Sequence, residues 1–139
     1  GPDGSMPWSF PRLVQPILDA HCARCHDGGG AAQPRLVNAA ADEFTGTYAA
    51  LRPFARWYEW GGDSISVIVT RPGEMPADLS PLTAILHDAN HAAELRLSDA
   101  EWRTLYLWLD GNAAFYGSYS APERLAQFAG EAIPPPALQ

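Results

Sequence analysis

Residues 14–26 read VQPILDAHCARCH, an apolar helical stripe that runs directly into two cysteines and a histidine. The apolar positions recur at the spacing of one helix face, which predicts a helix over about residues 11–24. Because proline is tolerated in a first turn but not inside a helix, Pro11 and Pro16 predict a start near Pro16 or a loose turn before it. The glycines of DGGG at 27–30 favour a left-handed cap and end the helix.

The cysteines carry the chemical signal. Cys22 and Cys25 are the only two in the chain, and His26 follows directly, which gives the spacing C-x-x-C-H. This spacing is the attachment signature of c-type haem. Two thiols one helical turn apart can each add across one haem vinyl group, and the next residue can then offer its imidazole to the iron. The motif predicts a covalently attached haem c (iron) on Cys22 and Cys25, with His26 as the proximal ligand.

Other chemistries for the pair fit less well. A redox dithiol usually lies at a strand-to-helix junction of a βαβ unit, a pattern that this sequence lacks. A zinc site could add His87 and His91, an H-x3-H pair, to Cys22 and Cys25. The segment between the two pairs is much longer than in a zinc finger. A single pair in a chain of 139 residues also argues against a disulfide scaffold.

The candidates for the other side of the iron are His21, Met75, His87 and His91. His21 adjoins the attachment site on the same helix and cannot reach the opposite face of the ring. Met75 precedes a proline, a common setting for a sulfur ligand, but a whole predicted helix separates it from the last large helix. His91 lies in a loop shortly before that helix, whereas His87 is typical of an exposed residue favoured at a helix C-terminus. We expect His91 as the distal ligand, with Met75, His87 and an open site as alternatives.

The remaining elements are mainly helices. Residues 42–57 predict a second helix, and the β-branched run SISVIVT predicts a short β-hairpin near 56–70. Ser80 supplies a capping hydroxyl for a helix that starts at the following proline and runs to about Asp88. The strongest helix follows the capping box of Ser98 and its partner three residues later. We therefore expect a mainly α fold with about four helices around one haem c.

The chain is expected to be one domain, since 139 residues with 47% apolar content can bury a single core. Residues 1–6, GPDGSM, are typical of a cloning and protease-cleavage remnant. We assign residues 7–120 to the domain and residues 121–139 to a C-terminal segment that packs on it or trails from it. A monomeric domain of a larger protein is expected.

The net charge and the hydropathy of the chain exclude some classes of binding partner. The net charge is −7, which argues against nucleic acid and anionic membranes because both require a basic face. No apolar run approaches the roughly 20 residues that a membrane span needs. A basic or neutral protein partner is compatible with this charge.

Residues 80–119 carry a family resemblance, together with VQPILDAHCARCHDGG near the start. The matching residues are Ser80, Pro81, Leu82, His91, Leu97, Ser98, Trp108, Leu109, Asp110, Asn112, Phe115, Tyr116 and Gly117. Over about residues 11–120 the chain resembles the C-terminal cytochrome c domain of hydrazine synthase alpha subunits and related secreted multidomain proteins. The resemblance implies a class I-like cytochrome c fold with one haem c, and it implies His91 as the distal ligand.

The resemblance also sets the expected function. It implies an electron relay and not hydrazine synthesis, because nothing in the chain corresponds to the separate catalytic haem module of the synthase. Two imidazole ligands, His26 and His91, leave no iron position for a substrate, so we expect an electron carrier and not an enzyme. Relatives appended to secreted polysaccharide-active proteins suggest a copper polysaccharide monooxygenase, or another haem protein, as redox partner.

Attachment of haem c occurs on the periplasmic side, so a periplasmic or extracellular location is expected. The alternative functions are a haem peroxidase-like or ligand-binding domain with a labile sixth site, and a zinc-stabilised binding module.

Overall fold

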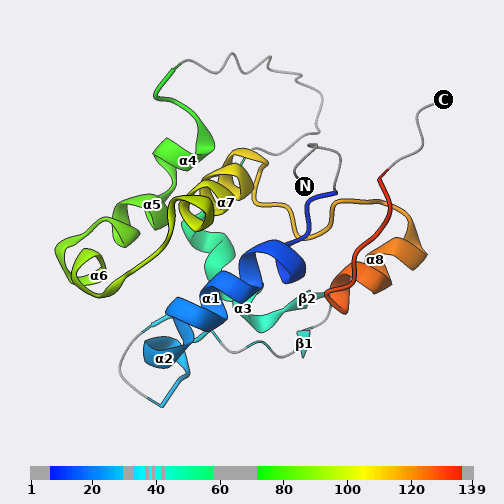
Figure 1. The fold of residues 1–139 in the computed structure, drawn as a ribbon, viewed down its shortest axis with the longest axis horizontal. Coiled ribbons are helices and arrows are strands. Elements are labelled where there is room, and N and C mark those ends of the chain that lie inside the picture. Colours follow the sequence, from blue (N-terminus) through cyan, green and yellow to red (C-terminus); the bar gives the residue numbers. More distant parts are fainter. Residues whose placement is uncertain are drawn as a thin grey trace. The chain divides into compact units, whose positions relative to one another are not determined.

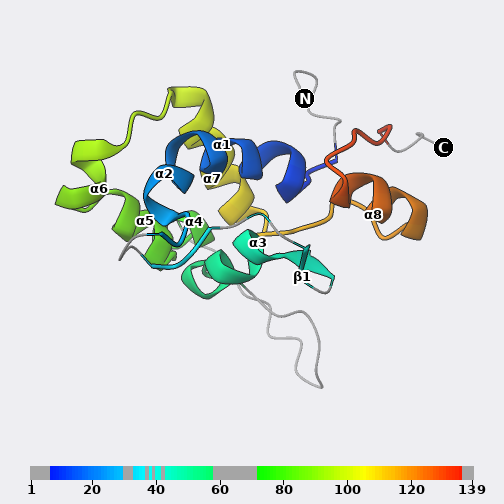
Figure 2. The same ribbon diagram turned by 90° about the horizontal axis from the view of Figure 1, so that it is seen from below.

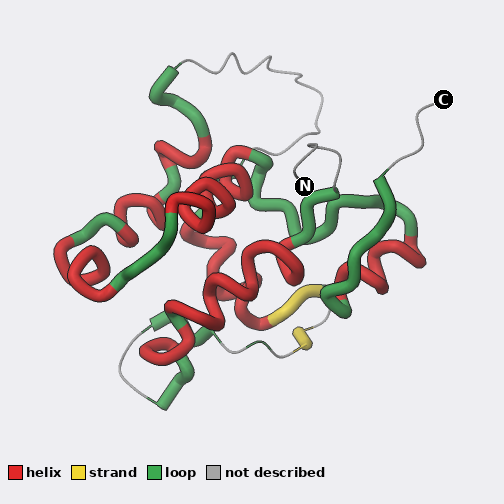
Figure 3. Tube along the Cα trace, in the orientation of Figure 1, coloured by secondary structure: helices red, strands yellow, loops and turns green. Residues whose placement is uncertain are grey.

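The computed structural model describes residues 7–29, 33–36, 38, 40–41, 43–57 and 72–135. The described chain is mainly helical, which confirms the predicted fold class at that level (Figures 1 and 3). The predicted hairpin near 56–70 lies outside the described residues except for its first two positions. The chain divides into two compact units. Unit 1 comprises Gly1–Ala50 with Ala114–Gln139, and unit 2 comprises Leu51–Ala113.

Unit 1 begins with the predicted helix and its predicted loose first turn. A π-helix, η1, spans Phe10–Val14, and the α-helix α1 follows at Gln15–His21. A short helix α2, Ala23–His26, carries the end of the motif. Gly28 then adopts a φ of 88°, a left-handed conformation that glycine takes without strain and that ends the helical path, as the sequence predicts.

The second helix starts later than predicted. The antiparallel strands β1, Ala40–Ala41, and β2, Phe44–Thr45, occupy the region where the helix was expected to begin. The helix α3 covers Gly46–Leu51 and is followed by a short 3₁₀ helix η2, Arg52–Phe54. The sequence predicted Thr45 inside the helix, but Thr45 is the last residue of β2. Its side chain Oγ1 accepts from Tyr48 N, in the first turn of α3, over 3.3 Å.

Aromatic rings form the core of unit 1. Phe115 lies at their centre, with ring centroids 5.8 Å from Phe10 and 4.9 Å from Tyr48. Phe10 N also donates to Phe115 O over 3.0 Å. The C-terminal helix α8, Ala121–Phe128, packs against η1 within the same unit (Figure 2). Unit 1 is therefore built from segments at both ends of the sequence.

The described residues of unit 2 contain, besides η2, four α-helices, three of them short and one long. They are α4 Pro76–Leu79, α5 Pro81–Leu86, α6 Ala89–Glu94 and α7 Asp99–Asp110. The predicted capping box of α7 is confirmed, with the Ser98 side chain accepting from Glu101 N and the Glu101 carboxylate accepting from Ser98 N. The start of α4 is bound to the end of α7, since Ala77 N donates to Asp110 Oδ1 over 2.8 Å.

The predicted capping role of Ser80 is wrong. Its hydroxyl donates to Pro76 O over 2.5 Å and accepts from Arg56 N over 2.8 Å. The buried side chain thus joins two segments of unit 2 instead of capping α5. The helix α5 still begins at the following proline, whose fixed φ suits a first turn.

Candidate functional site

Cys22 and Cys25 occupy one turn at the end of the first helical segment. Cys22 is the residue between α1 and α2, and its N–H donates to Leu18 O over 2.8 Å. Cys25 N in turn donates to Cys22 O over 3.1 Å. Both cysteines are free thiols, Cys22 half-buried and Cys25 exposed. The two thiols therefore lie one helical turn apart and are not consumed by a disulfide.

The pKa of Cys22 differs from that of the reactive thiol in a redox dithiol. Reactive cysteine pairs sit where a helix N-terminus or a cation lowers the thiol pKa. Here Cys22 lies between α1 and α2, and burial, with a smaller contribution from the neighbouring Cys25, raises the pKa of Cys22 to about 11. This raised pKa counts against the redox alternative.

The ring of His26 is fixed by a neighbouring carbonyl. Its Nδ1 lies 2.7 Å from Pro34 O. A carbonyl oxygen can only accept, so Nδ1 carries the ring proton and the lone pair of the neutral imidazole is on Nε2. Metal-binding histidines generally have this arrangement, in which an oxygen acceptor on one nitrogen orients the other. Leu36 N donates to His26 O over 2.7 Å and ties the returning segment to the motif.

The structure corrects the predicted setting of His91. It lies within the helix α6 and not in a loop, because Asp88 caps a new helix where the sequence suggested the end of the previous one. Asp88 Oδ1 accepts from His91 N over 2.8 Å and lies 3.2 Å from His91 Nδ1. The hydrogen bond from His91 N is the main reason why the pKa of Asp88 is lowered. A carboxylate acceptor again places the ring proton on Nδ1 and the lone pair on Nε2.

His87 is held through the opposite nitrogen. Its Nε2 lies 2.6 Å from the Tyr106 hydroxyl, and its ring stacks on Trp102 with centroids 4.8 Å apart and an interplanar angle of 7°. It is an exposed residue at the end of α5, as the sequence predicts. Binding iron through Nε2 would break the bond to Tyr106, which makes His87 a poor candidate ligand.

Met75 and His21, the other two candidates for the distal ligand, lie at the ends of helices. Met75 is the half-buried residue immediately before α4, and its carbonyl accepts from Leu79 N. His21 is the last residue of α1 and directly precedes Cys22. Neither position adds an observation that favours a ligand role over the sequence argument.

The structure brings three of the four predicted site residues into one segment. Cys22, Cys25 and His26 all lie between α1 and the end of α2, whereas His91 belongs to unit 2. The pairing of His26 with His91 on one iron therefore stays a prediction. Within the described ranges, no three His, Cys, Asp or Glu side chains form a group that could hold a metal ion.

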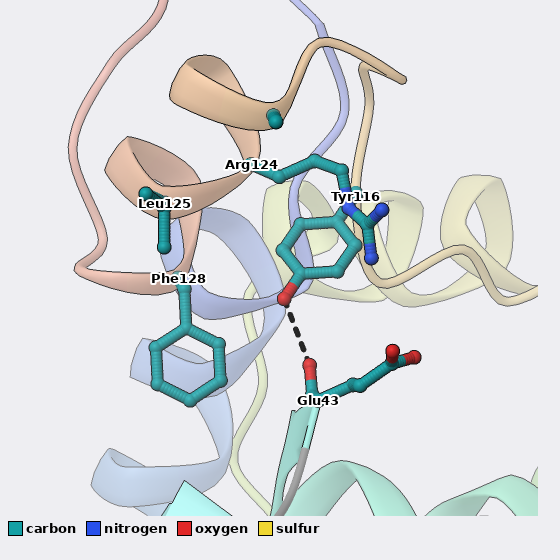
Figure 4. A pocket seen from close by; sticks show the side chains of 6 residues that line it. Glu43, Tyr116, Arg124, Leu125 and Phe128 are labelled. Atoms are coloured by element: carbon teal, nitrogen blue, oxygen red, sulfur yellow. Dashed lines mark hydrogen bonds between the residues drawn. The ribbon is translucent and has the colours of Figure 1, made fainter.

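A pocket in unit 1 was not predicted from the sequence. It has a volume of about 410 Å³ and is lined by Glu43, Tyr116, Ala121, Arg124, Leu125 and Phe128. The Tyr116 hydroxyl donates to Glu43 O over 2.8 Å, and the Arg124 guanidinium lies 4.7 Å from the Tyr116 ring centroid (Figure 4). The lining comes from segments far apart in the sequence, which no local pattern connects.

Comparison of the chain with models of protein families, with curated proteins and with solved structures found no match in any of the three. The resemblance to cytochrome c domains thus stays a prediction from the motifs. In the part of the chain that the structure describes, no helix has the length and apolar content needed to cross a membrane.

Proposed function

We propose that this chain is a mono-haem c electron-transfer domain. Cys22 and Cys25 would hold the haem through thioether bonds, and His26 would be the proximal ligand. One observation carries the proposal: two free thiols on one helical turn are followed by an imidazole whose Nδ1 is bound to Pro34 O at 2.7 Å. A bound haem c supplies a one-electron couple between ferric and ferrous iron. The residues present fit this group.

His91 is the proposed second axial ligand. Its Nδ1 is bound by a carboxylate, so its Nε2 carries the lone pair that a metal ligand requires. His87 has its Nε2 bound to Tyr106 instead, which sets the two histidines apart. Two imidazole ligands, from His26 and His91, would favour a lower reduction potential than a histidine–methionine pair. Such a site suits electron transfer and not the activation of peroxide or oxygen.

The fold and the partners follow from the same proposal. A class I-like cytochrome c fold is the finer assignment within the mainly α architecture. The partner would be a redox protein outside the cytoplasm, such as a copper polysaccharide monooxygenase or another haem protein. Encounters of this kind usually use small interfaces, and the net charge of −7 favours a basic or neutral docking face.

The absorption spectrum of the purified ferric protein tests the proposal, after production in cells that attach haem c. We expect an intense Soret band that survives acid–acetone extraction. The double variant Cys22→Ala, Cys25→Ala should lose covalent haem, because both thioether positions are gone. A colourless wild-type protein would reject the proposal and revive the zinc alternative.

The near-infrared region of the same spectrum tests the axial ligands. A low-spin ferric spectrum without a sulfur-to-iron charge-transfer band is expected for two imidazoles. The presence of that band would assign Met75 to the iron in place of His91. A high-spin spectrum with prompt cyanide binding would indicate an open site and a peroxidase-like or ligand-binding domain.

A further inference from the structure

One carboxylate oxygen holds His91 at two points. Asp88 Oδ1 accepts from the backbone N–H of His91 over 2.8 Å and lies 3.2 Å from Nδ1 of the same residue. The first bond caps α6, and the second binds the ring. The direction of the imidazole is therefore coupled to the first turn of the helix that carries it.

This contact also has an electronic consequence. A negatively charged acceptor at Nδ1 increases the basicity of the other ring nitrogen, Nε2. The side chains of His91 and Asp88 are 34% and 44% exposed. Solvent can therefore hydrate the charged carboxylate while its oxygen stays 3.2 Å from His91 Nδ1. His26 differs, because its acceptor is the neutral backbone carbonyl of Pro34. The two proposed axial imidazoles are thus expected to differ in donor strength.

We propose that Asp88 is a positioning residue for the distal ligand: it orients His91 and strengthens Nε2 as a donor to the haem iron. This inference rests on the proposed function. A stronger imidazole donor stabilises ferric iron more than ferrous iron, so Asp88 lowers the reduction potential of the domain. Contacts of this kind typically contribute 10–100-fold to metal affinity.

Three substitutions in the haem-loaded protein separate the two contacts. Asp88→Asn keeps a capping oxygen and an acceptor for the ring but removes the charge. Asp88→Ser keeps the cap alone, because its side chain is shorter, and Asp88→Ala removes both contacts. Asp99→Asn is the matched control, since it removes an exposed carboxylate from the first turn of α7.

The midpoint potential from a spectroelectrochemical titration is the main measurement. If Asp88→Asn lowers the preference of His91 for ferric over ferrous iron tenfold, the potential rises by about 59 mV for a one-electron couple. Asp88→Ser and Asp88→Ala should give at least this rise and should also accelerate binding of added imidazole to the ferric protein. Asp99→Asn should change neither quantity.

The outcomes distinguish the inference from the proposed function. Wild-type potentials in all three Asp88 variants, with a spectrum that does respond to His91→Ala, would overturn the inference and leave the proposed function intact. A rise of equal size in Asp99→Asn would also overturn it, as a general charge effect. If His91→Ala keeps the wild-type low-spin spectrum, His91 is not a ligand and the inference falls with that assignment. If Asp88→Ala fails to fold, Asp88→Asn and Asp88→Ser decide the question.

Discussion

His87 and His91 lie one helical turn apart in the sequence, yet unit 2 holds them by opposite ring nitrogens. His87 is bound at Nε2 by the Tyr106 hydroxyl and stacks on Trp102, so it joins α5 to α7. His91 is bound at Nδ1 by Asp88 within its own short helix. The hydrogen-bond partner of each imidazole therefore determines which ring nitrogen keeps a lone pair that a metal ligand requires.

The largest expected effect comes from removing each imidazole in turn. In the proposed haem-loaded protein, His91→Ala should convert the ferric haem from low-spin to high-spin and should let cyanide bind promptly, because the proposed distal ligand would be lost. His87→Ala should keep the low-spin spectrum. Absorption spectra with and without cyanide measure both. Met75→Leu is the control for the sulfur alternative, and a loss of the low-spin spectrum there would contradict the assignment of His91.

A smaller effect is expected from the helix that supports His87. Ser98→Ala removes the side chain that accepts from Glu101 N at the start of α7, which should lower the free energy of unfolding by about 1 kcal/mol. Urea denaturation measures this cost. Ser120→Ala is the matched control, because the Ser120 side chain caps no amide of α8 in the described part of the chain. Equal costs in the two variants would show that the capping box contributes nothing of its own.

The hydroxyl bound to His87 should contribute less. Tyr106→Phe removes one exposed hydrogen bond, for which we expect a loss of about 0.5 kcal/mol, at the low end for such bonds. The haem spectrum should stay unchanged, since this hydroxyl holds His87 and not His91. Tyr119→Phe is the control, because the Tyr119 side chain is fully exposed. A shifted midpoint potential in Tyr106→Phe alone would link His87 to the iron and break the comparison.

The smallest effect is a dependence on alkaline pH. Burial, and to a lesser extent the charge of Asp78, raise the pKa of Tyr106 above its ordinary value of 10.0. The folded state therefore keeps this phenol protonated at pH values where the unfolded chain has lost the proton. Stability conferred by this difference is present below pH 10.0 and falls as the pH rises from there to the folded pKa.

The difference between the ultraviolet titrations of wild type and Tyr106→Phe gives this midpoint directly. We expect a value above 10.0, and Asp78→Asn should lower it. A midpoint at or below 10.0 in the wild type would show that burial does not disfavour the phenolate.

Sequence reasoning succeeded where the deciding contacts are local. Ser98 and Glu101 cap α7 as predicted, because both partners lie within one turn. Pro11 and Pro16 predicted a start near Pro16 or a loose turn before it, and a π-helix spans Phe10–Val14 before α1 begins at Gln15. The mainly α composition follows from many such local choices, each of which can be recognised from a short stretch of sequence.

The failures involve competing partners. The Ser80 hydroxyl was expected to cap α5 but bonds to Pro76 O and Arg56 N, and Arg56 is far from it in the sequence. Asp88 was expected to end a helix but begins α6, so His91 moved from a loop into a helix. In both cases a short polar side chain could bond to either of two backbone partners, and contacts in the folded chain determined which bond formed.

The candidate site also contains residues that the sequence predicts and contacts that it does not predict. Cys22, Cys25 and His26 could be recognised together because the chemistry they would serve needs them adjacent in the sequence. The Pro34 carbonyl that orients His26 could not be foreseen, since any returning backbone could supply such an acceptor. The distal ligand is a prediction from spacing, and its test is the spectrum of the His91 variant.

The discontinuity of unit 1 has a consequence for the order of biosynthesis. Phe10 N bonds to Phe115 O, so this unit closes only when residues near both ends of the chain are present. A chain emerges N-terminus first, and Cys22 and Cys25 therefore appear long before Phe115. During that interval the thiols belong to a segment that has no completed core. If haem c is attached as proposed, the machinery that joins it to these thiols can act in this interval, before the unit closes.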